Sequence, residues 1–143
     1  MRKTFLFSII AIITCLSSIA FAQNGIIAVE IIGVENKDGQ VFIGLFNNND
    51  GFPDKGKEYK GAFVKVETGT LHHTFTEIPS GDYAIAIFHD SNTNGRFDKN
   101  FLGIPKEGYG FSSNATATFG APSFEKAKFQ FTDTYTAKIQ MRY

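Results

Sequence analysis

The sequence predicts an all-β protein, an antiparallel β-sandwich of the Ig-like or prealbumin-like kind. Short apolar runs and alternating apolar and polar residues dominate the chain, whereas helical spacing is nearly absent. Turn segments rich in Gly, Asn, Asp and Pro separate about seven such runs, as expected for a sandwich. A small closed barrel is the alternative architecture.

Residues 1–22 have the pattern of a secretory signal peptide. Arg2 and Lys3 precede an apolar run at 5–19, and Ala20-Phe21-Ala22 forms a small-x-small cleavage site. Cleavage would leave residues 23–143 as one β-sandwich domain. Cys15, the single cysteine, lies inside the signal, so the mature domain is expected to use no disulfide. We therefore expect an exported protein, periplasmic or extracellular.

The charge balance excludes an electrostatic case for nucleic-acid binding. The chain has 14 basic and 14 acidic residues, and loss of Arg2 and Lys3 leaves 12 basic residues. No basic run or patch appears. No later segment is apolar enough for a transmembrane span. A glycan or a protein of the cell envelope is the expected kind of partner.

Each predicted strand is a short apolar run bounded by turn residues. In chain order the strands are expected at 25–34, 40–47, 62–67, 71–78, 82–90, 128–133 and 135–143. The first two flank the turn segment 35–39 and are expected to form a hairpin. A helical turn with Ser123 as its cap is expected at 123–129.

Two of these strands have distinctive patterns. The run 82–90 is apolar on both faces, which predicts the central, most buried strand. The run 135–143 alternates strictly, which predicts a half-exposed antiparallel strand.

The segment 91–123 is predicted to be one long loop, and it is rich in aromatic residues. Such a loop could bind a glycan, a peptide or an apolar ligand. The favoured interpretation is that the rings fold back and cap one end of the core, because so long a loop needs ordering contacts. The rings in question belong to Phe97, Phe101, Tyr109, Phe111, Phe119 and Phe124.

The stretch HDSNTNGRFDKN (89–100) resembles half of a calcium-binding loop. Its oxygen donors alternate around a glycine turn, as in an EF-hand, but Phe101 stands where the closing glutamate belongs. The loop also follows a strand rather than a helix. A weak calcium site and a plain Asn-Gly turn are both compatible with this pattern. The candidate metal ligands are Asp90, Asn92, Asn94, Arg96 through its carbonyl, and Asp98.

Two further groups of polar residues are candidate metal ligands. Asp50 and Asp54, in the loop 47–54, could supply a calcium ligand if that loop lies at the same end of the sandwich. If 71–78 and 82–90 are neighbours, His89 would meet His72 or His73, although a third zinc or copper ligand is missing. Ordinary half-buried histidines are the preferred interpretation.

The sequence contains no catalytic motif. The mature chain lacks cysteine and G-x-S-x-G, so no catalytic residue is assigned. A small envelope hydrolase using Glu107, Asp90 or His89 remains an alternative, because paired carboxylates assemble in space. A carrier of apolar ligands is another, and it would need a cavity between the sheets.

The segment GDYAIAIFHDSNTNGRFDKNFLGIPKEGYGFSSNA and the later FGAPSFEKAKF resemble the bacterial exported family called domain of unknown function 2141. The resemblance implies a secreted or periplasmic β-sandwich and brings no established activity. A weaker likeness, through PSGDYAIAIFHDSNTNG, is to prealbumin-like modules of surface proteins. Together the sequence favours a non-enzymatic binding or scaffolding module of the cell envelope, with calcium as a candidate structural ion.

Overall fold

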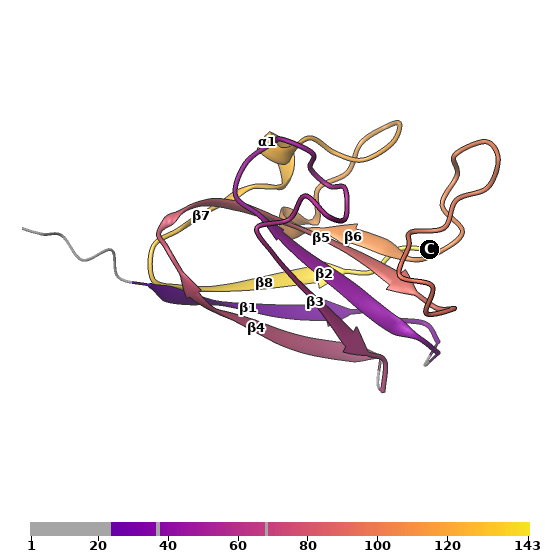
Figure 1. The fold of residues 1–143 in the computed structure, drawn as a ribbon, viewed down its shortest axis with the longest axis horizontal. Coiled ribbons are helices and arrows are strands. Elements are labelled where there is room, and N and C mark those ends of the chain that lie inside the picture. Colours follow the sequence, from indigo (N-terminus) through magenta and orange to yellow (C-terminus); the bar gives the residue numbers. More distant parts are fainter. Residues whose placement is uncertain (1–23, 37, 68) are drawn as a thin grey trace, which may run out of the picture.

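The computed structural model describes residues 24–36, 38–67 and 69–143, which form two facing β-sheets (Figure 1). The predicted signal peptide, with Cys15, lies outside these residues. The elements in chain order are β1 (Gly25–Ile32), β2 (Gln40–Phe46), β3 (Lys60–Lys65), β4 (Thr70–Ile78), β5 (Gly81–Asp90), β6 (Tyr109–Phe111), a 3-10 turn (Ser112–Asn114), α1 (Phe124–Ala127), β7 (Phe129–Phe131) and β8 (Thr134–Gln140).

The two sheets confirm the predicted β-sandwich. One sheet has three strands in the order β4-β1-β8, and the other has five, in the order β3-β2-β5-β6 with β7 also paired to β5. We call them the small and the large sheet. The strand that the sequence did not predict is β6, which lies inside the segment expected to be one long loop.

The predicted hairpin between 25–34 and 40–47 is wrong. β1 pairs with β4 and β8, whereas β2 pairs with β3 and β5, so the chain changes sheets between them. Residues such as Asn36 and Gly39 mark a turn, but a turn can lead across the sandwich as well as back along the same sheet. The same change of sheet separates β4 from β5 at Pro79–Ser80.

The expected antiparallel role of the last strand is also wrong. β8 runs parallel to β1, with Ile26 opposite Thr134 and Ile32 opposite Gln140. Its alternation was predicted correctly, because Ala137 and Ile139 are buried while Lys138 and Gln140 are exposed. Alternation reports which face of a strand is buried, and both directions of pairing satisfy it.

The main core lies between the sheets. Its members come from the inward faces of both, including Ile27, Val29 and Ile31 from β1 and Ile43, Ile85 and Ile139 opposite or beside them. These branched side chains exclude water from the centre of the sandwich, which is the main source of its stability.

A second apolar cluster covers the outer face of the large sheet. It consists of Phe46, Ala84, Ala86, Phe111, Phe124 and Ala127, with Phe52 packed against it. β5 therefore has buried residues on both faces from Tyr83 to Asp90, as predicted for the central strand. The covering elements are α1 and loops on the side away from the small sheet (Figure 1).

The helical turn expected at 123–129 is present as α1. Ser123 precedes it, but its side chain makes no capping hydrogen bond. Instead its backbone carbonyl accepts hydrogen bonds from the N–H groups of Lys126 and Ala127. Phe124 and Ala127 are the two residues that α1 buries against the large sheet.

Candidate functional site

The loop that leaves β5 is organised around the carboxylate of Asp90. This side chain is fully buried (0 % exposed) and accepts three hydrogen bonds. The backbone N–H of Asn94 donates to Oδ1 (2.9 Å), and that of Gly95 to Oδ2 (2.9 Å). The side chain of Gln40, on the paired strand β2, also donates to Oδ2 (2.9 Å). Asp90 therefore ties the loop to the large sheet.

The other predicted ligands gather close to Asp90. The amide groups of Asn92 and Asn94 both donate to Oδ2 of Asp98, at 2.8 and 2.9 Å. Their Oδ1 atoms accept backbone hydrogen bonds, from the N–H groups of Asn94 and Arg96 respectively. The five residues thus form one ordered turn, and Arg96 takes part through its backbone.

The carboxylate of Glu107 holds the start of the turn to its end through backbone hydrogen bonds. It is buried, and its Oε1 accepts from the backbone N–H of Ser91 (3.1 Å) while Oε2 accepts from that of Asp98 (3.0 Å). The sequence placed Glu107 near the loop only as a hydrolase candidate. The spacing of residues 89–100 could not predict that Glu107 holds this turn. The chain forms a separate loop, closed by the bridge between Lys99 and Pro105, before it reaches Glu107.

The hydrogen bonds of this turn show which side chains would have to rearrange to bind the predicted calcium ion. Within the described ranges no three His, Cys, Asp or Glu side chains form a metal-binding group. Oxygens of the two asparagines would therefore be needed, and at present their Nδ2 groups face Asp98. Calcium binding would require Oδ1 atoms to face that side instead. It stays a prediction.

The second acidic loop begins at the other end of the same strand pair. Gln40 of β2 lies opposite Asp90, whereas Phe46, which leads into the loop 47–59, lies opposite Ala84. The register thus gives no support for Asp50 as a ligand beside Asp90. Asp54 belongs instead to the groove described below.

The proposed pairing of histidines is wrong. β4 carries His72 and His73 in the small sheet, while β5 carries His89 in the large sheet, and the two strands do not pair. His72 is exposed. His73 packs edge-on against Phe75 (ring centroids 4.6 Å apart), and partial burial lowers its pKa.

His89 is a buried structural residue that connects three parts of the chain. Its Nε2 lies 2.7 Å from the backbone carbonyl of Asp38, so Nε2 carries the hydrogen. Nδ1 then accepts from the hydroxyl of Tyr143 (2.8 Å), which itself accepts from the N–H of Glu35 (3.2 Å). Burial raises the pKa of Tyr143, in line with a hydroxyl that acts as a donor in this network.

The aromatic residues of 91–124 divide into two groups. Phe97 packs on Phe88 and Tyr109, and Phe111 and Phe124 belong to the outer cluster, so these rings do fold back onto the body, but onto the outer face of the large sheet rather than the expected end of the core. Phe101 and Phe119 do the opposite and project into solvent. The loop therefore orders itself with some of its rings and exposes others.

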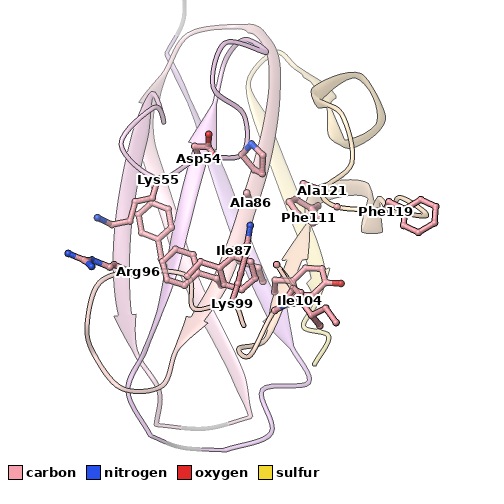
Figure 2. A pocket seen from close by; sticks show the side chains of 18 of the residues that line it. Asp54, Lys55, Ala86, Ile87, Arg96, Lys99, Ile104, Phe111, Phe119 and Ala121 are labelled. Atoms are coloured by element: carbon pink, nitrogen blue, oxygen red, sulfur yellow. The ribbon is translucent and has the colours of Figure 1, made fainter. Parts of the chain in front are cut away.

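A groove of about 730 Å³ lies on the outer face of the large sheet. Its floor is formed by aromatic and small residues of β2, β5 and β6, and three loops form its walls (Figure 2). The residues that line it include Phe42, Ala86, Phe88, Phe97, Ile104, Tyr109, Phe111 and Phe119. The sequence did not predict this groove, because its walls come from segments as far apart as 53–55 and 118–121.

Three cations stand around the groove. Figure 2 shows Lys55 and Arg96 along one side, and Lys99 reaches over the ring of Phe97 (Nζ to centroid 5.4 Å). Lys55 Nζ lies 5.8 Å from the centroid of Phe42. Among the residues that the structure describes, Asp54 is the one carboxylate that lines the groove. No ion pair involves these three cations within the part of the chain that the structure describes. The rim is therefore electropositive.

The position of the groove gives no support to the two alternative functions, a hydrolase and a carrier with a cavity between the sheets. None of His89, Asp90 and Glu107 lines the groove, and their polar atoms hold loops in place, so the hydrolase hypothesis gains no cleft from them. The carrier hypothesis needed a cavity between the sheets, where the main core is packed instead. The groove that does exist lies outside the sandwich.

The hydrogen bonds of Asp90 predict a stability effect. Asp90→Ala should lower the free energy of unfolding by about 3 kcal/mol, because it leaves two backbone N–H groups and Gln40 without their charged acceptor. Urea unfolding measures this. The exposed Asp50 is the matched control, and Asp50→Ala should change the value by less than about 0.5 kcal/mol. Equal effects of both substitutions would contradict the assigned role of Asp90.

No helix among the described residues has the length and apolar character needed to cross a membrane.

Comparison with known proteins identifies the family to which this chain belongs. No curated protein and no solved structure matches the chain. A family model does match, over residues 29–139, which include the Asp90 loop, Glu107 and the groove. This chain therefore belongs to the family described as "uncharacterized protein conserved in bacteria (DUF2141)".

Proposed function

We propose that this chain is an exported, non-enzymatic binding module of the bacterial cell envelope and that it binds its ligand in the groove on the large sheet. The observation that carries the proposal is the groove itself, with an aromatic floor and a rim of Lys55, Arg96 and Lys99. Its volume of about 730 Å³ lies within the range of roughly 300–1,000 Å³ typical of small-ligand sites.

The residues of the groove define the chemistry of the ligand. Phe97, Tyr109 and Ile104 offer apolar surface to a hydrocarbon or ring. The three cations favour a negative group at the rim, where charges are still hydrated but unpaired. We therefore infer an amphipathic acid, with an acyl chain and an anionic head, as the ligand class.

The residues considered as catalytic candidates lie away from the groove. Among the described residues, His89, Asp90 and Glu107 do not line it, and their polar atoms hold loops in place. This supports a binding module. A glycan or protein partner is less well matched by the apolar floor.

Titration with oleate tests the ligand class. Oleate should bind with a Kd in the micromolar range, and methyl oleate, which lacks the charge, about tenfold more weakly. The double variant Lys55→Gln/Lys99→Gln should weaken oleate binding by a similar factor. Lys138→Gln is the matched control, because Lys138 lies on the small sheet and pairs with Glu30. Absence of oleate binding, or equal binding of acid and ester, would overturn the proposal.

Export rests on the pattern of residues 1–22. Cell fractionation and mass spectrometry should find a processed chain beginning at Gln23 in the periplasmic or extracellular fraction. A chain lacking residues 2–22 should stay in the cytosol. Recovery of the unprocessed full-length chain in the cytosolic fraction would count against export.

We further propose that the turn 90–98 binds calcium weakly, with a structural role. The proposal is supported by one ordered, hydrogen-bonded turn that contains Asp90, Asn92, Asn94 and Asp98. Arg96 belongs to the same turn, because its backbone N–H donates to Oδ1 of Asn94. Of the oxygen donors only the two aspartates carry charge, so the affinity would suit the millimolar calcium outside cells. The ion would fix the start of the segment that forms one wall of the groove.

Thermal unfolding in calcium and in chelator tests this site. At a calcium concentration ten times the Kd, binding should raise Tm by about 4 °C. Magnesium should act less, because it demands a tighter octahedral geometry. Asp98→Asn should remove most of the calcium effect. An unchanged Tm between EDTA and about 10 mM calcium, roughly ten times the weakest Kd of about 1 mM typical of extracellular modules, would leave the plain Asn-Gly turn as the explanation.

A further inference from the structure

Large apolar side chains stand exposed at the tips of two loops beside the groove. Phe101 is 95 % exposed, Leu102 69 % and Ile104 55 %, all on the loop between β5 and β6. Phe119 is 91 % exposed, on the next loop of the chain. Leu102, Ile104 and Phe119 line the same groove, so the two tips flank one opening. Exposed apolar clusters of this kind mark interaction surfaces.

The first tip, residues 100–104, is a turn held by its own hydrogen bonds. Asn100 organises it, because its Oδ1 accepts from the N–H groups of Leu102 (2.9 Å) and Ile104 (3.0 Å). Its backbone N–H donates to the carbonyl of Ile104, and its carbonyl accepts from Gly103. The bridge between Lys99 and Pro105 closes the base. The turn thus holds its apolar side chains outward in a fixed arrangement.

The same hydrogen bonds make the tip suited to an apolar medium. Backbone N–H groups resist transfer out of water unless they have partners. Here the N–H groups of Asn100, Leu102, Gly103 and Ile104 are all bonded within the turn. Insertion of the tip would therefore bury apolar side chains without leaving those four donors unsatisfied.

The charges around the tip are mostly positive. Arg96, Lys99 and Lys106 are exposed, and no ion pair involves them among the described residues. The acidic groups near them are less accessible, because Asp98 accepts from the amides of Asn92 and Asn94 and Glu107 is buried. Exposed cations beside protruding apolar residues are complementary to a bilayer with anionic head groups.

We propose that the tip Asn100–Ile104, together with Phe119, docks onto the surface of an anionic lipid bilayer, with the groove opening at that surface. A bilayer accepts separate protruding tips, whereas a protein partner would favour a continuous flat patch. Docking itself stands on the tips and the cations. Its purpose, the exchange of an acyl ligand with the membrane, rests on the proposed function of the groove.

The absence of tryptophan from the chain allows a clean test. Phe101→Trp places a single indole at the tip, and its emission should shift to the blue when vesicles of phosphatidylcholine with about 30 % phosphatidylglycerol are added. Vesicles of phosphatidylcholine alone should give a much smaller shift. Ile26→Trp is the matched control, since Ile26 is an exposed apolar residue of the small sheet, and it should give none.

Co-sedimentation with the same anionic vesicles gives the second measurement. Phe101→Asp should lower the partition coefficient at least tenfold, and 0.5 M salt should weaken binding of the unmodified protein. Phe101 does not line the groove, so Phe101→Asp should leave oleate affinity unchanged. No blue shift at position 101, or full vesicle binding by Phe101→Asp, overturns docking. Vesicle binding without oleate binding overturns the proposed function of the groove and leaves docking standing.

Discussion

The burial of β5 on both faces is the constraint on which the rest of this structure depends. Its inward face is covered by the small sheet, but its outward face, with Ala84, Ala86 and Phe88, needs a second cover. α1 and Phe52 supply that cover over one part of the strand. Over the rest, the loops stand apart and leave the groove. The candidate ligand site is therefore an incompletely covered second core.

The end of β5 shows how the same constraint shapes the loop behind it. Asp90 continues the outward face, where a carboxylate can be buried only if donors surround it. The chain meets this need by turning back so that two of its own N–H groups reach the side chain. The turn that resembles a calcium loop in its spacing is thus also the turn that supplies hydrogen-bond donors to the buried carboxylate of Asp90. An ion would add to a turn that already closes through protein contacts.

The sequence predicted the faces of the strands well and their neighbours poorly. Alternation identified the buried residues of β8, and two-sided apolar character identified β5, because burial acts on each side chain locally. Pairing depends on where a turn delivers the chain, which is why the expected hairpin, the antiparallel β8 and the histidine pair were wrong. At the site, Asp90 and Asp98 belong to one hydrogen-bonded turn, to which both are tied through Asn94, whereas the predicted ion stays a prediction. Glu107 and the groove escaped prediction since they join segments distant in the chain.

The parallel pairing of β8 with β1 has a consequence for the order of folding. β1 is the middle strand of the small sheet, and one of its two neighbours comes from the far end of the chain, with Ile26 beside Thr134. Contacts between such distant segments form late, because the chain loses the entropy of closing a long loop before the new contacts stabilise it. Because β8 is the last strand of the chain, β1 lacks one of its two neighbours until residues 134–140 have paired with it. The topology thus makes closure of the small sheet, and with it of the main core, depend on the C-terminal strand.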